Sequence, residues 1–344
     1  MLPLNPYCPQ QKLTIRWDIV FCTPKPVKSA IRCRRVSLAE LYLNPTPSCF
    51  GGSCVEKSKA RVYVLGVPYD GTVSWRPGAR EAPHTIRVAA ANIEFYSFRL
   101  DVDVEEIPIA DIGDLAVSFD VKETLKRLSI VVHELAQTLG RQHLLVVLGG
   151  EHTITLGVFE GLAKAELDPC LLVFDAHLDC RDEYMGSRLT HATFSRRLVE
   201  SYGYNRTFHL GTRAACREEV EFVRRKNIHY LTSFEIRFLG LREVARRVLA
   251  WLKQSPCKTL YISVDMDAYD PAYAPGVSTP EPDGLEPWMM LELLDHIVLH
   301  STKPLVAVDI VEVSPPYDSS GITSVLAART IVELIAAHQT AQQR

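Results

Sequence analysis

The chain has 344 residues, of which 47% are hydrophobic and 23% are charged, and its formal net charge is −3 at pH 7. This composition allows a large buried core and gives no overall charge signal for nucleic-acid binding. The apolar runs, such as 144–148 and 170–174, are far shorter than the roughly 20 residues that a membrane-spanning helix needs. The composition therefore excludes a basic scaffold and a membrane-spanning protein, and it favours an enzyme that acts on a small molecule.

Residues 1–36 differ from the rest of the chain, because they carry seven basic residues against one acidic residue, together with five prolines. Repeated proline breaks the amphipathic helix that a transit peptide needs, and no apolar stretch there resembles a signal sequence. We therefore expect a disordered or artefactual N-terminal extension over 1–36, followed by a single catalytic domain over 37–344.

Nine cysteines are present, and five of them fall within the first 54 residues. They show neither a C-x-x-C pair nor zinc-finger spacing in that segment, and an odd total does not describe a complete disulfide framework. We expect unpaired thiols in a reducing cytoplasm.

From Arg61 onward, short apolar runs alternate with longer segments whose apolar residues have helical spacing. The expected strands are 61–67, 143–149, 170–176, 206–212, 259–265 and 304–310. The expected helices are 120–140, 192–203, 215–226, 238–254, 286–300 and 321–338. Such alternation is typical of a parallel sheet that is covered by helices on both faces. The sequence thus predicts an α/β domain.

Polar side chains follow several of the expected strands directly. In chain order they are His152; Asp175, His177 and Asp179; Asp265 and Asp267; and Glu312. In an open α/β sheet the carboxyl ends of the strands meet at one edge, where ligands bind. The period of two along an extended chain would also point Asp175, His177 and Asp179 to the same side. We therefore expect these side chains to lie together.

Four carboxylates and two imidazoles are too many ligands for one divalent ion, and an oxygen-rich set with some histidine suits Mn(II) better than structural zinc. Two neighbouring ions can share carboxylates and generate a hydroxide nucleophile near neutral pH. The sequence has no phosphate-binding P-loop, no G-x-S-x-G elbow and no dinucleotide fingerprint. These observations indicate a metal-dependent hydrolase without an organic cofactor.

Four segments carry a resemblance to a known family: 149–157 (GGEHTITLG), 174–194 (FDAHLDCRDEYMGSRLTHATF), 263–271 (SVDMDAYDP) and 309–318 (DIVEVSPPYD). They resemble the signatures of the arginase and agmatinase (ureohydrolase) family, and the likeness runs from about Leu41 to the C-terminus. The resemblance implies a three-layer α/β/α fold with a central parallel sheet of about eight strands. It also implies two Mn(II) ions per chain and a homotrimer or homohexamer.

The resemblance assigns a role to each candidate residue. One manganese would be held by His152, Asp175, Asp179 and Asp265, and the other by His177, Asp175, Asp265 and Asp267. His191 matches the family's histidine that passes a proton to the leaving amine, a task that suits an imidazole near neutral pH. Glu312 matches the glutamate that pairs with the substrate guanidinium, which a carboxylate can bind through two parallel hydrogen bonds.

Two segments, 67–87 and 182–197, look more like those of agmatinases, particularly archaeal-type ones, than of arginases. The resemblance therefore implies hydrolysis of agmatine to putrescine and urea, a step of polyamine biosynthesis. Arg188 leaves this open, because two interpretations fit it: an ion pair with Asp182 or Glu183, or a contact with an acidic substrate. The alternatives are an N1-aminopropylagmatine ureohydrolase, another guanidino-compound hydrolase such as an arginase, or a single-zinc deacetylase.

Overall fold

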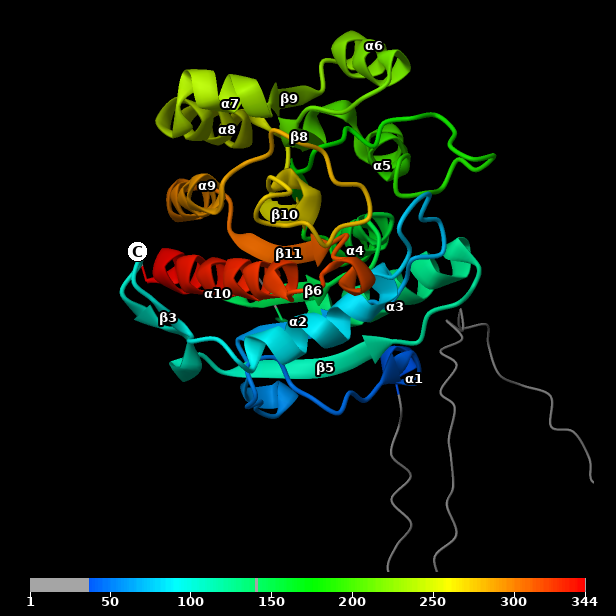
Figure 1. Cartoon of the computed structure of the whole chain (residues 1–344). Coiled ribbons are helices and arrows are strands. Elements are labelled where there is room, and N and C mark those ends of the chain that lie inside the picture. The colour runs from blue at the N-terminus through cyan, green and yellow to red at the C-terminus, as the bar shows by residue number, and fades with distance from the viewer. Residues whose placement is uncertain (1–36, 140–141, 344) are drawn as a thin grey trace, which may run out of the picture.

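The computed structural model describes residues 37–139 and 142–343, so the expected extension over 1–36 lies outside the described residues. The centre of the molecule is a nine-stranded sheet with the strand order β1-β5-β2-β6-β11-β10-β7-β8-β9 (Figure 1). In that order the strands are Leu43–Asn44, Ile109–Leu115, Val62–Gly66, Leu144–Leu148, Leu305–Val311, Thr259–Asp265, Pro169–Phe174, Thr207–Thr212 and His229–Thr232. A separate two-stranded sheet pairs β3 (Tyr96–Ser97) with β4 (Val102–Asp103).

The sheet is parallel except at one edge. Every neighbouring pair from β5 to β9 is parallel, while the two-residue strand β1 pairs antiparallel with β5. The expectation of about eight parallel strands is therefore confirmed, and the antiparallel edge strand is an addition. The six strands expected from the sequence are all present, with bounds that differ by at most two residues.

Helices cover both faces of the sheet. One face packs against α2 (Ala82–Ala90), α8 (Leu241–Gln254), α9 (Pro287–His300) and α10 (Ile322–Gln342). The other face packs against α3 (Val121–Leu139), α4 (Ile154–Lys164), α5 (Phe194–Tyr202) and α6 (Arg217–Lys226). Two short helices, α1 (Leu38–Leu41) and α7 (Ser233–Leu239), are also present in the described part of the chain. The three-layer α/β/α architecture is confirmed.

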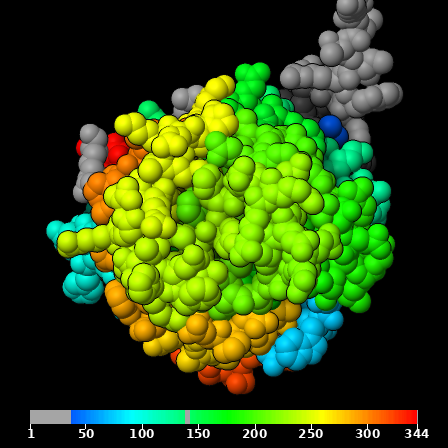
Figure 2. Space-filling view, turned by 90° about the horizontal axis from the view of Figure 1, so that it is seen from above, coloured from blue at the N-terminus to red at the C-terminus, as the bar shows by residue number. Residues whose placement is uncertain are grey.

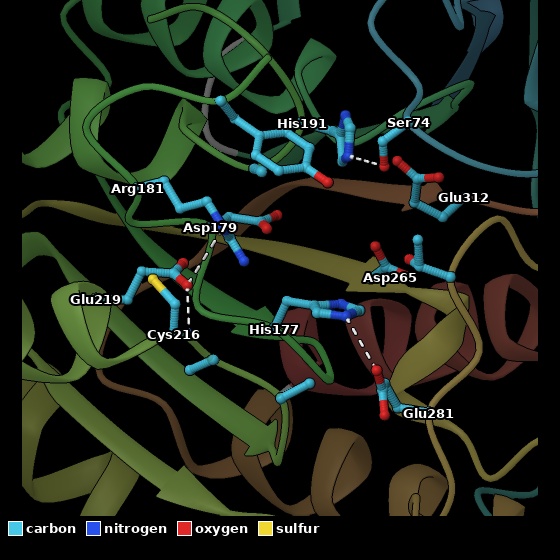
Figure 3. Close-up of a pocket in the computed structure, with 15 residues that line it drawn as sticks. Ser74, His177, Asp179, Arg181, His191, Cys216, Glu219, Asp265, Glu281 and Glu312 are labelled. Carbon is cyan, nitrogen blue, oxygen red and sulfur yellow. Dashed lines mark hydrogen bonds and ion pairs between the residues drawn. The ribbon is translucent and has the colours of Figure 1, made fainter.

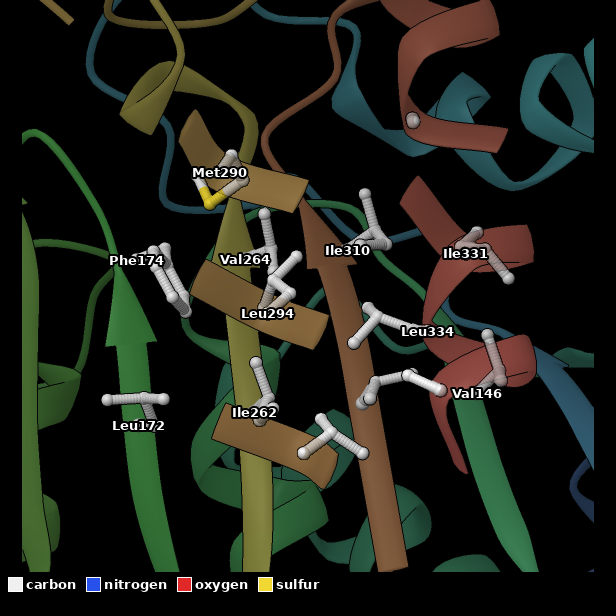
Figure 4. Packing of buried hydrophobic residues seen from close by; sticks show 14 of the residues in the cluster. Val146, Leu172, Phe174, Ile262, Val264, Met290, Leu294, Ile310, Ile331 and Leu334 are labelled. Atoms are coloured by element: carbon white, nitrogen blue, oxygen red, sulfur yellow. The ribbon is translucent and has the colours of Figure 1, made fainter. Parts of the chain in front are cut away.

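Alternation along the buried strands explains why both faces need a cover. In β2, Val62 and Val64 belong to the core beneath α10, while Tyr63 and Leu65 belong to the core on the opposite side. Figure 4 shows the first core, where side chains of α9 and α10 pack onto the apolar residues of the central strands. Because the central strands are buried on both sides, the polar residues at their carboxyl ends stand on a rigid base.

The β9 edge of the sheet is covered by a region of the chain that runs from α5 to α8. Helix α7 packs against β8 and β9. The green and yellow residues of this region form most of the face seen in Figure 2. Among the described residues, none of the helices combines the length and apolar character needed to cross a membrane.

The expectation of unpaired cysteines is wrong for four of them. The structure pairs Cys49 with Cys54 and Cys170 with Cys257 in disulfides, whereas Cys180 and Cys216 are free. The second pair forms because β7 and β10 are neighbours: their register sets Cys170 opposite Leu260, three residues after Cys257, and the two cysteine Cα atoms lie 5.4 Å apart. This proximity across 87 residues depends on strand order, which spacing along the sequence does not reveal.

Candidate metal centre and substrate pocket

The candidate residues follow four strands that are neighbours in the centre of the sheet. The strands β6, β11, β10 and β7 are adjacent and parallel, so their carboxyl ends meet at one edge. Asp265 is the last residue of β10, and Asp267 lies in the 3-10 turn that follows, Met266–Ala268. Strand β7 ends at Phe174, so Asp175 to Asp179 lie in the loop beyond it.

A first cluster forms around the imidazole of His152. Its Nδ1 atom lies 3.2 Å from Asp175 Oδ2, 3.3 Å from Asp179 Oδ2 and 3.2 Å from Asp265 Oδ2. One ring nitrogen carries at most one proton, so it cannot donate to three carboxylates at once. Among the described residues, Nδ1 of His152 and Oδ2 of Asp175 are buried polar atoms without a hydrogen bond of good geometry. This convergence of buried donor atoms fits a bound cation.

A second cluster shares Asp175 with the first. The Nδ1 atom of His177 lies 3.4 Å from Asp175 Oδ1 and 3.0 Å from Asp267 Oδ2. The ligand atoms of His152, Asp175 and Asp265 lie within 4.8 Å of one another, as do those of Asp175, His177 and Asp267. Two adjacent groups with a carboxylate in common are the arrangement that a pair of neighbouring metal ions requires.

Backbone groups hold these side chains in place. The N–H of His177 donates to Asp175 Oδ1 at 2.5 Å, and the N–H of Asp267 donates to Asp265 Oδ1 at 2.8 Å. On His152, Nε2 lies 2.9 Å from Ser263 Oγ, which turns Nδ1 toward the carboxylates. Asp179 reaches the cluster from a left-handed backbone conformation with φ of 51°. Loop geometry, rather than alternation along a strand, therefore brings Asp175, His177 and Asp179 together.

The charges of the cluster are unbalanced without a cation. Burial raises the pKa of Asp179, and the nearby Asp175 carboxylate raises it further. Burial likewise raises the pKa of Asp265, with a further contribution from Asp267. For His152, burial lowers the pKa, but hydrogen bonds to the surrounding carboxylates outweigh it and raise the pKa well above its usual value. Divalent ions would let all the carboxylates ionise beside neutral imidazoles.

A pocket of about 260 Å³ opens onto these clusters. His191, Ser74 and Glu312 lie close together on one side of it, above Asp265 and His177 (Figure 3). Glu312 Oε1 accepts the N–H of His152 at 2.7 Å, while its buried Oε2 has no partner among the described residues. Burial raises the pKa of Glu312 to about 7. His191 has a pKa that burial lowers, and its Nε2 lies 3.3 Å from Ser74 Oγ.

The lining of the pocket also contains charged residues that the sequence analysis did not single out. Arg181 lies 3.6 Å from the Glu219 carboxylate and is centred 4.8 Å from the Tyr184 ring, so its charge is already engaged. Glu281 lines the pocket near His177, whose Nε2 is 4.0 Å away. Only the folded chain brings these residues together, and no local sequence pattern marked them. Arg188 does not line the pocket; its Nη2 pairs with Asp182 at 2.9 Å.

Comparisons with known proteins decide the family. A model of the arginase family matches residues 60–337. The chain belongs to the arginase family. An N(1)-aminopropylagmatine ureohydrolase of Thermococcus kodakarensis is 36% identical, over 76% of this chain and 85% of its own. An agmatinase of Halalkalibacterium halodurans is 32% identical, over 81% of this chain and 92% of its own.

Among solved structures, the agmatine ureohydrolase of Thermoplasma volcanium superimposes with a TM-score of 0.74 at 35% identity, covering 83% of this chain and 92% of that one. This arginase-family chain is thus a ureohydrolase that acts on a guanidino compound and resembles agmatinases. The two histidine and aspartate clusters are consistent with the binuclear metal site of the arginase family.

Proposed function

We propose that the protein is an agmatinase, which hydrolyses agmatine to urea and putrescine with two Mn(II) ions. The observation that carries the proposal is a pocket lined by two separate carboxylates. Glu312 lies near Ser74 and Asp265, and Glu281 lies beside His177. Agmatine carries a guanidinium at one end and an amine at the other, and both are cations.

The ligand set favours manganese. Four carboxylates and two imidazoles form an oxygen-rich site, which suits Mn(II) better than a thiolate-preferring ion. His152, Asp175, Asp179 and Asp265 would hold one ion, and His177, Asp175, Asp265 and Asp267 the other, with Asp175 and Asp265 shared. When bound, the two ions supply positive charge and an activated water for the hydrolysis of a guanidinium C–N bond.

Glu312 is suited to hold the guanidinium. Its Oε1 is fixed by the N–H of His152 at 2.7 Å, so Oε2 is the atom left to accept a substrate N–H. A carboxylate in a buried site binds a planar guanidinium in a defined orientation, which places the reacting carbon over the metal ligands. The substrate's own positive charge would also favour the ionised form of this carboxyl, whose pKa burial otherwise raises.

His191 is suited to hand a proton to the leaving amine. It lines the pocket, with Nε2 beside Ser74 Oγ and the ring edge-on to Tyr184 at a centroid distance of 5.8 Å. Its low pKa means that it is neutral near pH 7 and can both receive and release a proton during one turnover.

Glu281 is the candidate for the amine end of the substrate. Arg213 fixes the segment that carries it, because Nη2 of Arg213 donates to the carbonyl oxygens of Glu281 at 2.7 Å and Asp267 at 2.6 Å. The Glu281 side chain is 40% exposed and projects toward the pocket. Since Arg181 is engaged by Glu219 and Tyr184, the pocket lining around Glu281 favours a cationic tail over a carboxylate.

A longer polyamine substrate is the second candidate. The Thermococcus kodakarensis relative is named for N(1)-aminopropylagmatine, which extends the amine end and leaves the guanidinium unchanged. Glu281 is partly exposed at the pocket wall, so an extended tail would pass it toward solvent.

The first test is urea release by the Mn-loaded protein from agmatine, N1-aminopropylagmatine and arginine, with kcat/KM compared among them, together with metal content per chain. Two manganese ions and the highest kcat/KM for agmatine would support the proposal. A preference for the aminopropyl compound would move the assignment to the second candidate. One bound zinc with deacetylation of an acetylated amine, and no urea from any guanidino compound, would overturn both.

A further inference from the structure

The hydroxyl of Thr72 lies between a buried carboxyl group and the candidate proton carrier. Thr72 Oγ1 is 2.5 Å from Glu151 Oε1, and the Thr72 N–H donates to Glu151 Oε2 at 2.6 Å. On its other side, Thr72 Oγ1 accepts the backbone N–H of His191 at 3.1 Å and lies 3.5 Å from His191 Nδ1. Glu151 is fully buried. The Thr72 side chain therefore connects Glu151, the residue before the candidate metal ligand His152, to His191.

With Glu151 ionised, counting protons gives these hydrogen bonds a direction. The oxygens of Glu151 receive the Thr72 N–H, the Thr72 hydroxyl and the Thr153 hydroxyl, which are all donors. A hydroxyl has a single proton, so once Thr72 donates it to Glu151, its oxygen can only accept from His191. The ring nitrogen facing Thr72 must therefore carry hydrogen. Nδ1–H is then the neutral tautomer of His191, and the unprotonated Nε2 faces the pocket beside Ser74.

The contact is not needed to anchor the loop that carries Thr72. The N–H groups of Gly150 and Glu151 already donate to the carbonyl oxygens of Val67 at 3.0 Å and Tyr69 at 2.8 Å. A Cβ atom at position 150 would overlap the Tyr69 carbonyl, so glycine permits this close approach. Farther along, Asp70 Oδ2 accepts the N–H of Gly78 at 2.9 Å. The loop is tied at both ends without the Thr72 hydroxyl.

We propose that Thr72, held by Glu151, is a positioning residue that sets the tautomer and orientation of His191. The inference rests on the proposed function, in which His191 transfers a proton to the leaving amine. With Nδ1 occupied by Thr72, Nε2 is the atom that exchanges protons with the substrate. Thr72 touches neither the substrate nor the metal ligands; it acts through His191.

The test replaces the hydroxyl while keeping the shape of the side chain. Thr72→Val has nearly the same volume but accepts no hydrogen bond, so kcat for the proposed substrate should fall by about tenfold or more while KM stays within about twofold. Thr72→Ser retains the hydroxyl and should stay within about threefold of the wild-type kcat. Thr85→Val on α2, whose hydroxyl bonds only to carbonyl oxygens of its own helix region, is the matched control.

The outcomes separate the inference from the proposed function. Equal kcat values for Thr72→Val and Thr72→Ser would overturn the positioning role, as would a rise in KM with kcat unchanged. Nitrogen NMR of protein labelled with 15N-histidine gives a readout without turnover, with the His191 signals assigned through His191→Asn. Neutral His191 protonated at Nδ1 in the wild type, and shifted toward Nε2 in Thr72→Val, supports the inference even if no urea is released. A neutral His191 protonated at Nε2 in the wild type overturns it.

Discussion

Arg87 is a guanidinium buried between a helix and the sheet, with 1% of its side chain exposed. From α2 it reaches β5, where Nε and Nη2 donate to the two oxygens of Asp111 at 2.7 and 2.9 Å, and Nη1 donates to Asp114 Oδ1 at 2.7 Å. Replacing it with methionine keeps much of the volume and removes the charge. We expect Arg87→Met to destabilise the fold strongly, because it leaves Asp111 buried without its cation.

The magnitude follows from what each carboxylate retains. Removing one partner of a buried ion pair costs about 3–5 kcal/mol. Asp111 keeps hydrogen bonds from the N–H groups of Phe50 at 3.0 Å and Gly113 at 3.1 Å, and Asp114, whose side chain is 24% exposed, can be hydrated. Because of these remaining interactions, we expect the free energy of unfolding to fall by about 3 kcal/mol, the lower end of that range.

Urea unfolding followed by tryptophan fluorescence measures this loss. Arg246→Met, which breaks an exposed pair with Glu243 on α8, is the matched control and should leave the unfolding midpoint unchanged. Adding Asp111→Asn to Arg87→Met should recover part of the lost stability, because the uncompensated charge is removed. The reasoning is refuted if Arg87→Met is no more destabilising than Arg246→Met, or if the second substitution lowers stability further.

Three further predictions concern the metal centre, the pocket and pH. Asp265→Asn should reduce bound manganese below two per chain by elemental analysis; full occupancy would contradict its bridging role. Glu281→Gln should lower kcat/KM for agmatine by at least about tenfold through KM, whereas the exposed Glu221→Gln should not; equal effects would exclude an amine site. Burial raises the pKa of Asp295 to about 6, despite its pairing with Arg99. The folded state therefore binds the extra proton between about pH 4 and 6, and the stability of the wild type relative to Asp295→Asn should fall as pH rises through that window; a constant difference would contradict it.

The sequence predicted the central strands well, because they depend on local pattern, and it picked out candidate metal ligands that the structure brings together. Apolar runs followed by Asp and His can be recognised in the sequence alone, and the parallel sheet brings the carboxyl ends of these strands together. The reason given for Asp175, His177 and Asp179 was wrong, however. They converge through a loop that includes the left-handed Asp179, and not through strand alternation. Residue identity was more informative here than the assumed local geometry.

Other elements were not predicted because their residue pattern can be explained only by contacts that form in the folded protein. Strand β5 contains Asp111 and Asp114, which read as loop residues until Arg87 from α2 neutralises them in the interior. The contacts of Thr72 and Glu281 with the site also join loops that are far apart in the chain. Their roles depend on which segments the sheet order makes neighbours, and a single sequence does not contain that order.

The strand order has a consequence for how the protein matures. Strand β10 inserts between β7, which is made before it, and β11, which is made after it. A nascent chain that has emerged only as far as α8 possesses His152, Asp175, His177 and Asp179 but lacks both Asp265 and Asp267. Strand β11 is made after β10 and inserts between β6 and β10, so these non-local pairings close the sheet late. Binding of two metal ions by the proposed ligands would thus require the completed polypeptide, and metal retention would then report on its biosynthesis.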